Sequence, residues 1–197
     1  MERDIDFAQR YARGDIPWDS GKPSEELIRV LKAAKLTGKT ALEIGCGTGT
    51  NAIELARRGF EVTAVDCVEA AIRIARGKAS EAQVNVNFRV ADVLTQALGG
   101  PYDVLFDRGV YHALRMVDLA KFQNMLKRVT RRGSWCLCLA GNAKETKSEK
   151  GPPVVTEREI RAEFGPLFEI VELREFRFAT NQPDFRPLAW SILMRRK

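Results

Sequence analysis

The chain has 197 residues, a length that suits one α/β domain with a substantial core. Its hydrophobic share of 45% and charged share of 29% are ordinary for a soluble globular protein, and the lack of about 18 uninterrupted apolar residues argues against a transmembrane helix. The net charge of +6 comes from scattered basic clusters without interleaved aromatic residues, which is more typical of solvated helix ends than of a nucleic-acid interface.

Residues 1–23 precede any core-forming pattern. The charged residues at positions 1–6 are not a signal peptide, so a cytoplasmic location is expected. Residues 4–12 are spaced like a short helix, and residues 14–23 are rich in turn formers around Trp18. Trp18 has two open interpretations: it belongs to a lid over an active site, or it plugs the base of the domain.

From residue 24 onward, helical and strand patterns alternate. Ser24 is expected to cap a helix that Gly38 ends. The expected strands are 40–44, 60–66, 84–90, 102–107, 134–140, 168–178 and 188–194, and the expected helices are 51–58, 69–77 with an extension, 118–129 and 157–164 capped by Thr156. Residues 141–153 are expected to form a charged, mobile loop. Such alternation predicts a parallel sheet with helices on both faces, in one domain.

The four cysteines, Cys46, Cys67, Cys136 and Cys138, fall in or beside the expected central strands. The last two have C-x-C spacing, and the chain has one histidine, so neither a zinc site nor a redox pair is predicted. We expect reduced, buried thiols in a cytoplasmic protein and no metal.

The stretch 40–51 carries the strongest functional signal. A strand ends near Glu43, glycines follow at 45, 47 and 49, and a helix then begins. A dinucleotide fingerprint needs glycines at its first, third and sixth places, but here the third glycine comes one place early. Glu43 would repel a pyrophosphate and suits an ammonium group. The ligand is therefore interpreted as a nucleoside with a cationic or zwitterionic tail.

Carboxylates end or follow two further strands. Asp66 ends the second strand, 21 residues after Gly45, where an acid can accept both hydroxyls of a ribose. Helix capping is the alternative for Asp66. Asp92 follows the third strand and could contact the same ligand. The alternative for Asp92 is a solvated loop residue without a ligand contact. Three successive strand ends would thus contact one adenosine-like ligand.

The run Glu-Ile-Gly-Cys-Gly-Thr-Gly at 43–49 resembles motif I of the class I S-adenosylmethionine-dependent methyltransferases. The resemblance implies a Rossmann-like sheet of seven mostly parallel strands with an antiparallel last strand. It also implies that Asp92 accepts from the adenine amino group while Val93 packs on the ring. The implied cofactor-binding residues are Trp18, Glu43, Gly45, Cys46, Gly47, Thr48, Gly49, Asn51, Asp66, Cys67, Asp92, Val93 and Asp107, for S-adenosylmethionine and its product S-adenosylhomocysteine.

The segments 16–23 and 107–112, with later stretches, are similar to the thiopurine and tellurite-resistance groups of small-molecule methyltransferases. This resemblance implies that Arg108 and Tyr111 line an acceptor pocket near Trp18. His112 or Tyr111 could take the proton of a phenol or hydroxyl. A sulfur, selenium or tellurium anion would need no base, only the charge of Arg108. The sequence leaves these two possibilities open.

Two other functions remain as alternatives. The net charge suggests an RNA or protein methyltransferase, although an Asn-Pro-Pro-Tyr-type motif is absent after the fourth strand. A non-catalytic S-adenosylmethionine-binding module is the other alternative, disfavoured by the intact glycine loop and both acids. We expect a small-molecule acceptor, no membrane partner, no nucleic acid, and a monomer or homodimer.

Overall fold

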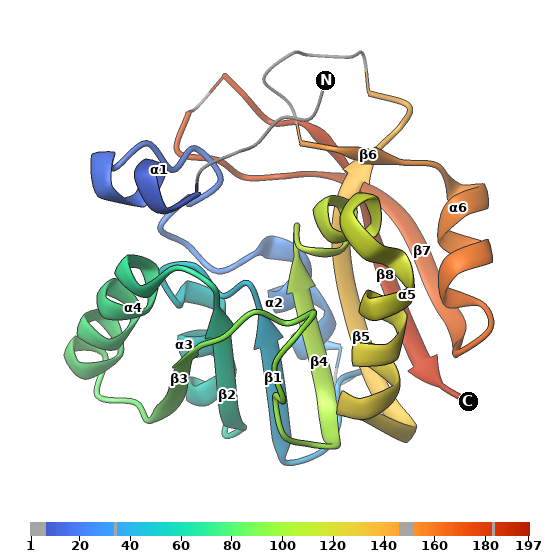
Figure 1. Cartoon of the computed structure of the whole chain (residues 1–197), viewed down its shortest axis with the longest axis horizontal. Coiled ribbons are helices and arrows are strands. Elements are labelled where there is room, and N and C mark those ends of the chain that lie inside the picture. The colour runs from blue at the N-terminus through green and yellow to red at the C-terminus, as the bar shows by residue number, and fades with distance from the viewer. Residues whose placement is uncertain (1–6, 34, 146–151, 183) are drawn as a thin grey trace.

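A computed structural model describes residues 7–33, 35–145, 152–182 and 184–197. Figure 1 shows a twisted central sheet with helices on both faces. The eight strands are β1 (Thr40–Ile44), β2 (Glu61–Asp66), β3 (Val86–Val90), β4 (Tyr102–Arg108), β5 (Thr130–Asn142), β6 (Val154–Val155), β7 (Phe168–Arg177) and β8 (Leu188–Arg196). The helices are α1 (Phe7–Arg13), α2 (Glu25–Lys32), α3 (Thr50–Arg57), α4 (Glu69–Glu81), α5 (Tyr111–Val129) and α6 (Glu157–Phe164).

The strand order is β3-β2-β1-β4-β5-β8-β7, and the short β6 pairs with β5 outside this path. β8 runs antiparallel to both β5 and β7, while β1 to β5 are parallel. The Rossmann-like sheet and its antiparallel last strand are therefore confirmed. The order reverses between β1 and β4, so ligands are expected beyond the carboxyl ends of these two strands.

The side chains of β1 point alternately to the two faces of the sheet, where the core forms two layers. Leu42 and Ile44 pack with α5 and α6 on one face, whereas Ala41 packs with α2, α3 and α4 on the other. Side chains of a strand point alternately to its two faces, so Glu43 shares the face of Ala41. A carboxylate is thereby built into an otherwise apolar strand, next to the loop that follows.

Several expected boundaries are wrong. The second helix ends at Lys32, well before Gly38. Ser24 occupies its N-cap position, but its side chain makes no capping bond, and its backbone N–H donates to Asn51 Oδ1 instead (2.8 Å). The fifth helix begins at Tyr111, seven residues before the expected start at Asp118. Asp118 has non-helical φ and ψ (−159°, 91°), so the helix consists of two pieces that meet at a kink at the expected start.

β5 and the cysteines also differ from expectation. β5 continues to Asn142, because its last two residues pair with β6, so the expected loop at 141–153 begins later. Residues 146–151 of that loop lie outside the described part of the chain. Cys46, Cys136 and Cys138 are buried, but Cys67 is exposed because it follows the end of β2. In the described ranges no helix is long and apolar enough to cross a membrane.

Candidate functional site

The loop between β1 and α3 is shaped by its glycines. Gly45, Gly47 and Gly49 all have positive φ (59°, 54° and 79°), which other residues adopt only with strain. A Cβ at Gly45 would lie 2.1 Å from Val110 Cγ2, and one at Gly49 would lie 2.8 Å from Ala75 Cβ. The loop can therefore lie close to its surroundings only as glycine.

Glu43 lies beneath this loop and is only 1% exposed. Its Oε1 accepts a hydrogen bond from Asn51 Nδ2 (3.2 Å), while its buried Oε2 has no partner among the described residues. Burial raises the pKa of Glu43 to about 8, and hydrogen bonding from Asn51 and the backbone of Ala52, with the charge of Arg108, opposes this only in part. An unpaired buried carboxylate oxygen is costly, so this position fits a cationic donor from a ligand.

Asp66 ends β2 and is 8% exposed. Its Oδ2 accepts from the backbone N–H of Gly47 (2.9 Å), and its Oδ1 accepts from that of Val68 (2.9 Å). The carboxylate thus fixes the glycine loop, and a carboxylate has about four acceptor positions, so it can still accept from a ligand. The expected helix-capping alternative and a ribose contact are compatible in this geometry.

Asp92 and Val93 follow β3. Val93 is buried, whereas Asp92 is exposed, and its carboxylate accepts from Leu94 N and Thr95 Oγ1 (both 2.9 Å). These bonds stabilise the turn that follows without any ligand. The contact of Asp92 with an adenine stays a prediction.

A segment of the N-terminal region, residues 16–24, crosses the glycine loop and is called the strap here. The Thr48 hydroxyl donates to Asp19 Oδ2 (2.6 Å) and accepts from Lys78 Nζ (2.6 Å). The Trp18 indole donates to the Tyr11 hydroxyl (3.3 Å), which lies over Gly47. Trp18 is therefore at the ligand edge of the sheet, not at its base.

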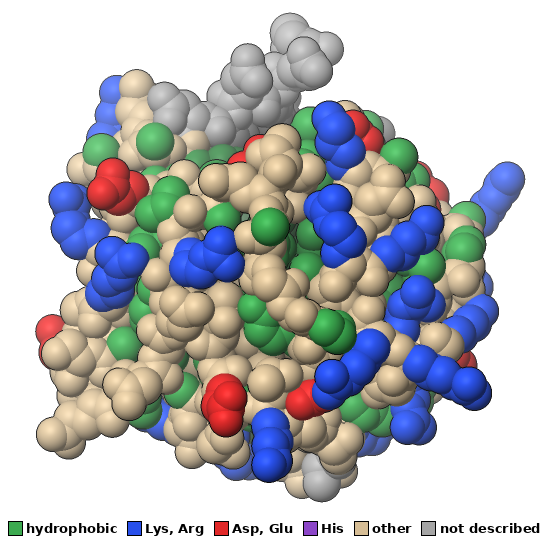
Figure 2. All heavy atoms as spheres, turned by 60° about the horizontal axis from the view of Figure 1, so that its bottom comes forward, with side chains coloured by type: hydrophobic (Ala, Val, Ile, Leu, Met, Phe, Trp, Pro, Cys, Tyr) green, Lys and Arg blue, Asp and Glu red, His purple; other side chains and the backbone are tan. Residues whose placement is uncertain are grey.

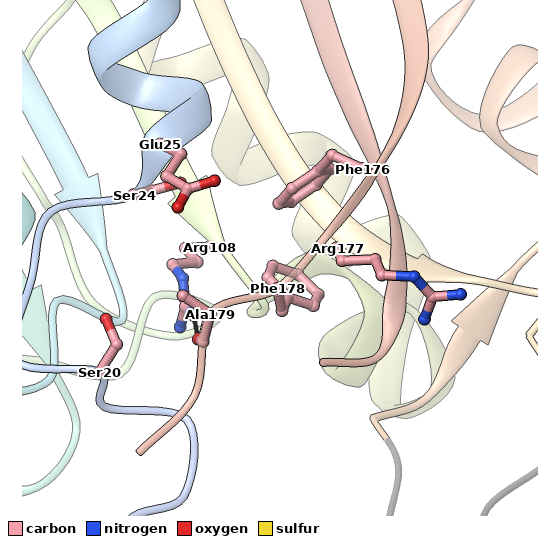
Figure 3. Close-up of a pocket in the computed structure, with 8 residues that line it drawn as sticks. All are labelled: Ser20, Ser24, Glu25, Arg108, Phe176, Arg177, Phe178 and Ala179. Atoms are coloured by element: carbon pink, nitrogen blue, oxygen red, sulfur yellow. Dashed lines mark hydrogen bonds between the residues drawn. The ribbon is translucent and has the colours of Figure 1, made fainter. Parts of the chain in front are cut away.

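Arg108, at the end of β4, joins the strap to the β7–β8 connection. Its Nη1 donates to Trp18 O (2.8 Å), its Nη2 donates to Ala179 O (2.6 Å), and its guanidinium lies 5.0 Å from the centre of the Phe178 ring. Figure 3 shows a crevice in which Arg108 lies between Ser20 and Ser24 on one side and Phe178 and Ala179 on the other. Arg108 is thus a half-buried cation beside an aromatic ring.

Asp107 and Tyr111 occupy the start of α5. Asp107 is 1% exposed and accepts from the backbone N–H groups of Val110 (2.8 Å) and Tyr111 (2.9 Å). The Tyr111 side chain is fully buried, and its hydroxyl donates to Glu163 Oε2 (2.8 Å). The expectation that Tyr111 lines an acceptor pocket is therefore corrected, because the early start of α5 turns this side chain into the core.

His112 is buried between α5 and β5. Its Nδ1 accepts a hydrogen bond from the backbone N–H of Gly141 (2.9 Å), and its Nε2 lies beside Gly109. Burial, and next the charge of Arg108, lowers the pKa of His112 to about 4. The ring is thus held neutral near pH 7.

Three residues at this edge were not singled out from the sequence: Tyr11, Asp19 and Lys78. Their partners, Gly47 and Thr48, are distant along the chain, and only folding brings them together. The turn-rich composition around Asp19 was the only available signal. In the described ranges no group of His, Cys, Asp and Glu could hold a metal ion.

Sequence comparison identifies a methyltransferase domain at residues 41–133, from β1 to the start of β5. The chain is 26% identical over 173 residues to 2-heptyl-1-hydroxyquinolin-4(1H)-one methyltransferase of Mycobacteroides abscessus, covering 86% of this chain and 76% of that protein. A magnesium-protoporphyrin O-methyltransferase of Rhodobacter capsulatus is 42% identical over 79 residues, but this match spans about a third of each chain (39% and 35%).

Solved structures share the fold across most of the chain. A structure from work on the conversion of a disulfide bond into a thioacetal group during echinomycin biosynthesis has a TM-score of 0.80 and 25% identity, covering 92% of this chain and 85% of that one. TehB of Haemophilus influenzae has a TM-score of 0.71 at 21% identity, covering 86% and 62%. Magnesium protoporphyrin IX methyltransferase of Synechocystis, solved with bound S-adenosylmethionine, has a TM-score of 0.68 at 19% identity, covering 100% and 87%.

Proposed function

Because the chain is a class I S-adenosylmethionine-dependent methyltransferase, we propose that it transfers a methyl group to a small-molecule acceptor. The observation that carries the proposal is the unpaired, buried Oε2 of Glu43 beneath a loop that only glycine can form. A dinucleotide phosphate would place negative charge near this carboxylate. The amino group of S-adenosylmethionine would supply the missing positive donor.

Within this proposal the remaining cofactor contacts follow the edge of the sheet. Asp66 uses its free lone pairs for the ribose hydroxyls, and Asp92 with Val93 contacts the adenine. Cys46 and Thr48 belong to the glycine loop, Cys67 follows Asp66, and Trp18 belongs to the strap that crosses the loop. Asp107 acts indirectly, because backbone N–H groups already occupy its carboxylate.

S-adenosylmethionine supplies a methyl group activated by its sulfonium. The residues of this chain bind it, orient it toward the acceptor and exclude water. The strap contributes to this exclusion by crossing the glycine loop, and Arg108 joins it to the acceptor side. We therefore propose residues 1–23 as a lid segment on a core of residues 24–197.

The activities of these two relatives support a small-molecule acceptor. They concern a hydroxyquinolone and a magnesium porphyrin, both ring systems that offer a heteroatom or carboxylate. For this chain we propose a soft sulfur, selenium or tellurium nucleophile or a small aromatic or heterocyclic compound. The positive charge of Arg108 and the ring of Phe178 suit either group.

Isothermal titration with S-adenosylmethionine tests the cofactor site. We expect binding, and we expect Asp66→Ala to weaken it by about 1–3 kcal/mol, the cost of losing buried hydrogen bonds. A matched control is Glu54→Gln, because Glu54 is an acid on α3 whose ion pair among the described residues is with Arg58 at the C-cap of that helix (2.8 Å). The proposal fails if the wild-type protein does not bind the cofactor.

Product formation tests the transfer. Incubation with S-adenosylmethionine and thiols, phenols, heterocyclic amines, selenite or tellurite should yield S-adenosylhomocysteine with at least one class. Binding without product across the whole panel would instead support a non-catalytic module.

A further inference from the structure

Three side chains that could take a proton from an acceptor lie at the end of β4 and the start of α5: Asp107, Tyr111 and His112. A general base needs a free lone pair within hydrogen-bond reach of the proton it removes. The structure shows what each of the three already binds.

His112 accepts the backbone N–H of Gly141 at Nδ1, so Nδ1 carries no proton. A neutral imidazole has one N–H, and here the proton must reside on Nε2. Moving it to Nδ1 would set two donors, His112 Nδ1–H and Gly141 N–H, against each other at 2.9 Å. Nε2 forms no hydrogen bond with the described residues, so His112 offers a donor, not a base.

Asp107 and Tyr111 are also engaged in hydrogen bonds within the protein. The Asp107 carboxylate accepts from two backbone N–H groups and from Cys138 Sγ (3.3 Å), with both oxygens buried at the start of α5. The Tyr111 hydroxyl binds Glu163, which also pairs with Arg115. Burial and the neighbouring Glu163 raise the pKa of Tyr111, so it does not ionise near neutral pH.

The remaining acids of this edge belong to the other side of the glycine loop. Glu43, Asp66 and Asp92 lie at the ends of β1, β2 and β3, where we place the cofactor. On the β4 side the crevice beside Arg108 is also lined by Arg177 and by Glu25, whose largely exposed carboxylate pairs with Arg186 (3.8 Å). Arg108 uses two of its five N–H donors in bonds to the described residues. The acceptor side therefore offers positive charge and hydrogen-bond donors.

We propose that the acceptor enters this site already ionised and is held as an anion by Arg108 and the Nε2–H of His112, without a general base. This inference rests on the proposed methyl transfer. The acceptor loses its proton to water beforehand. Its lone pair then forms the bond to the methyl carbon while the methyl–sulfur bond breaks, and that electron pair stays on sulfur to leave a neutral thioether.

The substrate class follows from acidity. Suitable acceptors are thiols and acidic hydroxyls on aromatic or heteroaromatic rings, because these ionise near neutral pH and charge-assisted bonds can hold their anions. Aliphatic alcohols would be excluded, because no described group at the end of β4 is free to remove their proton.

A set of para-substituted thiophenols and phenols, similar in shape but graded in acidity, tests the proposal. We expect kcat/KM to rise with pH and level off at the pKa of each acceptor, so that the break point moves along the series. His112→Gln keeps a donor but cannot take a proton, and we expect it to retain kcat within about tenfold, whereas losing a general base typically costs about 100-fold or more.

A break point at one fixed pH for all acceptors would overturn the proposal while leaving methyl transfer intact. Because the wild-type profile alone separates these outcomes, the test does not depend on the variant folding. Cofactor binding without product from any acceptor would instead overturn the transfer itself, and this inference with it.

Discussion

At the scale of single residues, Glu43 is the feature that most sharply links sequence to ligand. Its carboxyl sits beside a glycine turn, buried, with one oxygen unpaired among the described residues. Burying a charge without a partner is unfavourable, so the folded protein without cofactor holds Glu43 protonated over a wider pH range than the unfolded chain does.

This raised pKa predicts a pH dependence of stability. Between about pH 5 and pH 8 the folded state binds more protons at Glu43 than the unfolded state, so stability falls as pH rises through this window. Glu43→Gln should flatten that fall when thermal unfolding is measured without cofactor. Asp66 and Asp107, whose pKa values burial also raises, contribute equally to both proteins. Parallel curves for the two proteins would contradict the assignment.

Tyr111 provides a second residue-level prediction. Tyr111→Phe removes the hydroxyl that donates to Glu163, a carboxylate buried between α5 and α6. We expect a loss of about 1–3 kcal/mol in the free energy of unfolding, measured by urea denaturation, with kcat unchanged. A large fall in kcat at unchanged stability would indicate instead that Tyr111 contacts the acceptor.

At the scale of elements, the strap has few fully buried residues: Ser24 is buried, whereas residues 16–23 are half-buried or exposed. Ile16 and Trp18 pack at the edge of a small apolar cluster, and polar bonds join the strap to the rest of the site: Asp19 with Thr48, Trp18 O with Arg108, and Asn181 N with Pro17 O (3.0 Å). Segments with few buried apolar contacts open at low free-energy cost. Cofactor exchange is therefore expected to depend on these bonds.

Thr48→Val tests the strap without changing the size of the side chain. It removes the hydroxyl shared by Asp19 and Lys78, and we expect S-adenosylmethionine to dissociate roughly 5- to 10-fold faster, as for a net bond of about 1 kcal/mol. Stopped-flow fluorescence can follow it, because Trp18 is one of three tryptophans. Thr63→Val is the control, because the hydroxyl of this buried β2 threonine bonds only to Asn87 among the described residues. Equal dissociation rates in the wild type and both variants would contradict a role of Thr48 in holding the strap on the glycine loop.

At the scale of the whole molecule, one group of exposed positive charges lies away from the site. Exposed cations end α5 (Lys127, Arg128), begin β5 (Arg131, Arg132) and end β8 (Arg195). α5 and β8 run against the parallel strands, so all three sets lie at the amino edge of the sheet, opposite the glycine loop. Figure 2 shows Lys and Arg side chains gathered along one side of this face.

This separation predicts that the charge is not used in catalysis. The double variant Arg128→Glu with Arg132→Glu should leave kcat/KM for a thiophenol within about twofold, because exposed charges a Debye length or more away are screened, about 8 Å at physiological salt. The assay is S-adenosylhomocysteine formation at two salt concentrations. A strong loss that is specific to an RNA acceptor would favour the nucleic-acid alternative instead.

Local sequence signals were sufficient to predict the fold class and the cofactor of this protein. Glycines at 45, 47 and 49 and a strand ending in Asp66 depend on backbone sterics and strand period, so the Rossmann-like order and the S-adenosylmethionine cofactor could be predicted from sequence. The boundaries of helices and strands also depended on contacts that these local signals do not include. The early start of α5 comes from Asp107 capping Val110 and Tyr111 across a turn, and the length of β5 from its pairing with β6.

The acceptor side was decided only by tertiary structure. The sequence placed Arg108, Tyr111 and His112 on one rim but could not say which way each side chain points. Folding sends Tyr111 into the core, sets His112 Nδ1 against Gly141, and leaves Arg108 between the strap and Ala179. These partners lie 29 to 90 residues away along the chain, so no local pattern encodes them. A hydrogen-bonding role is a property of two groups in space, and only the fold brings both together.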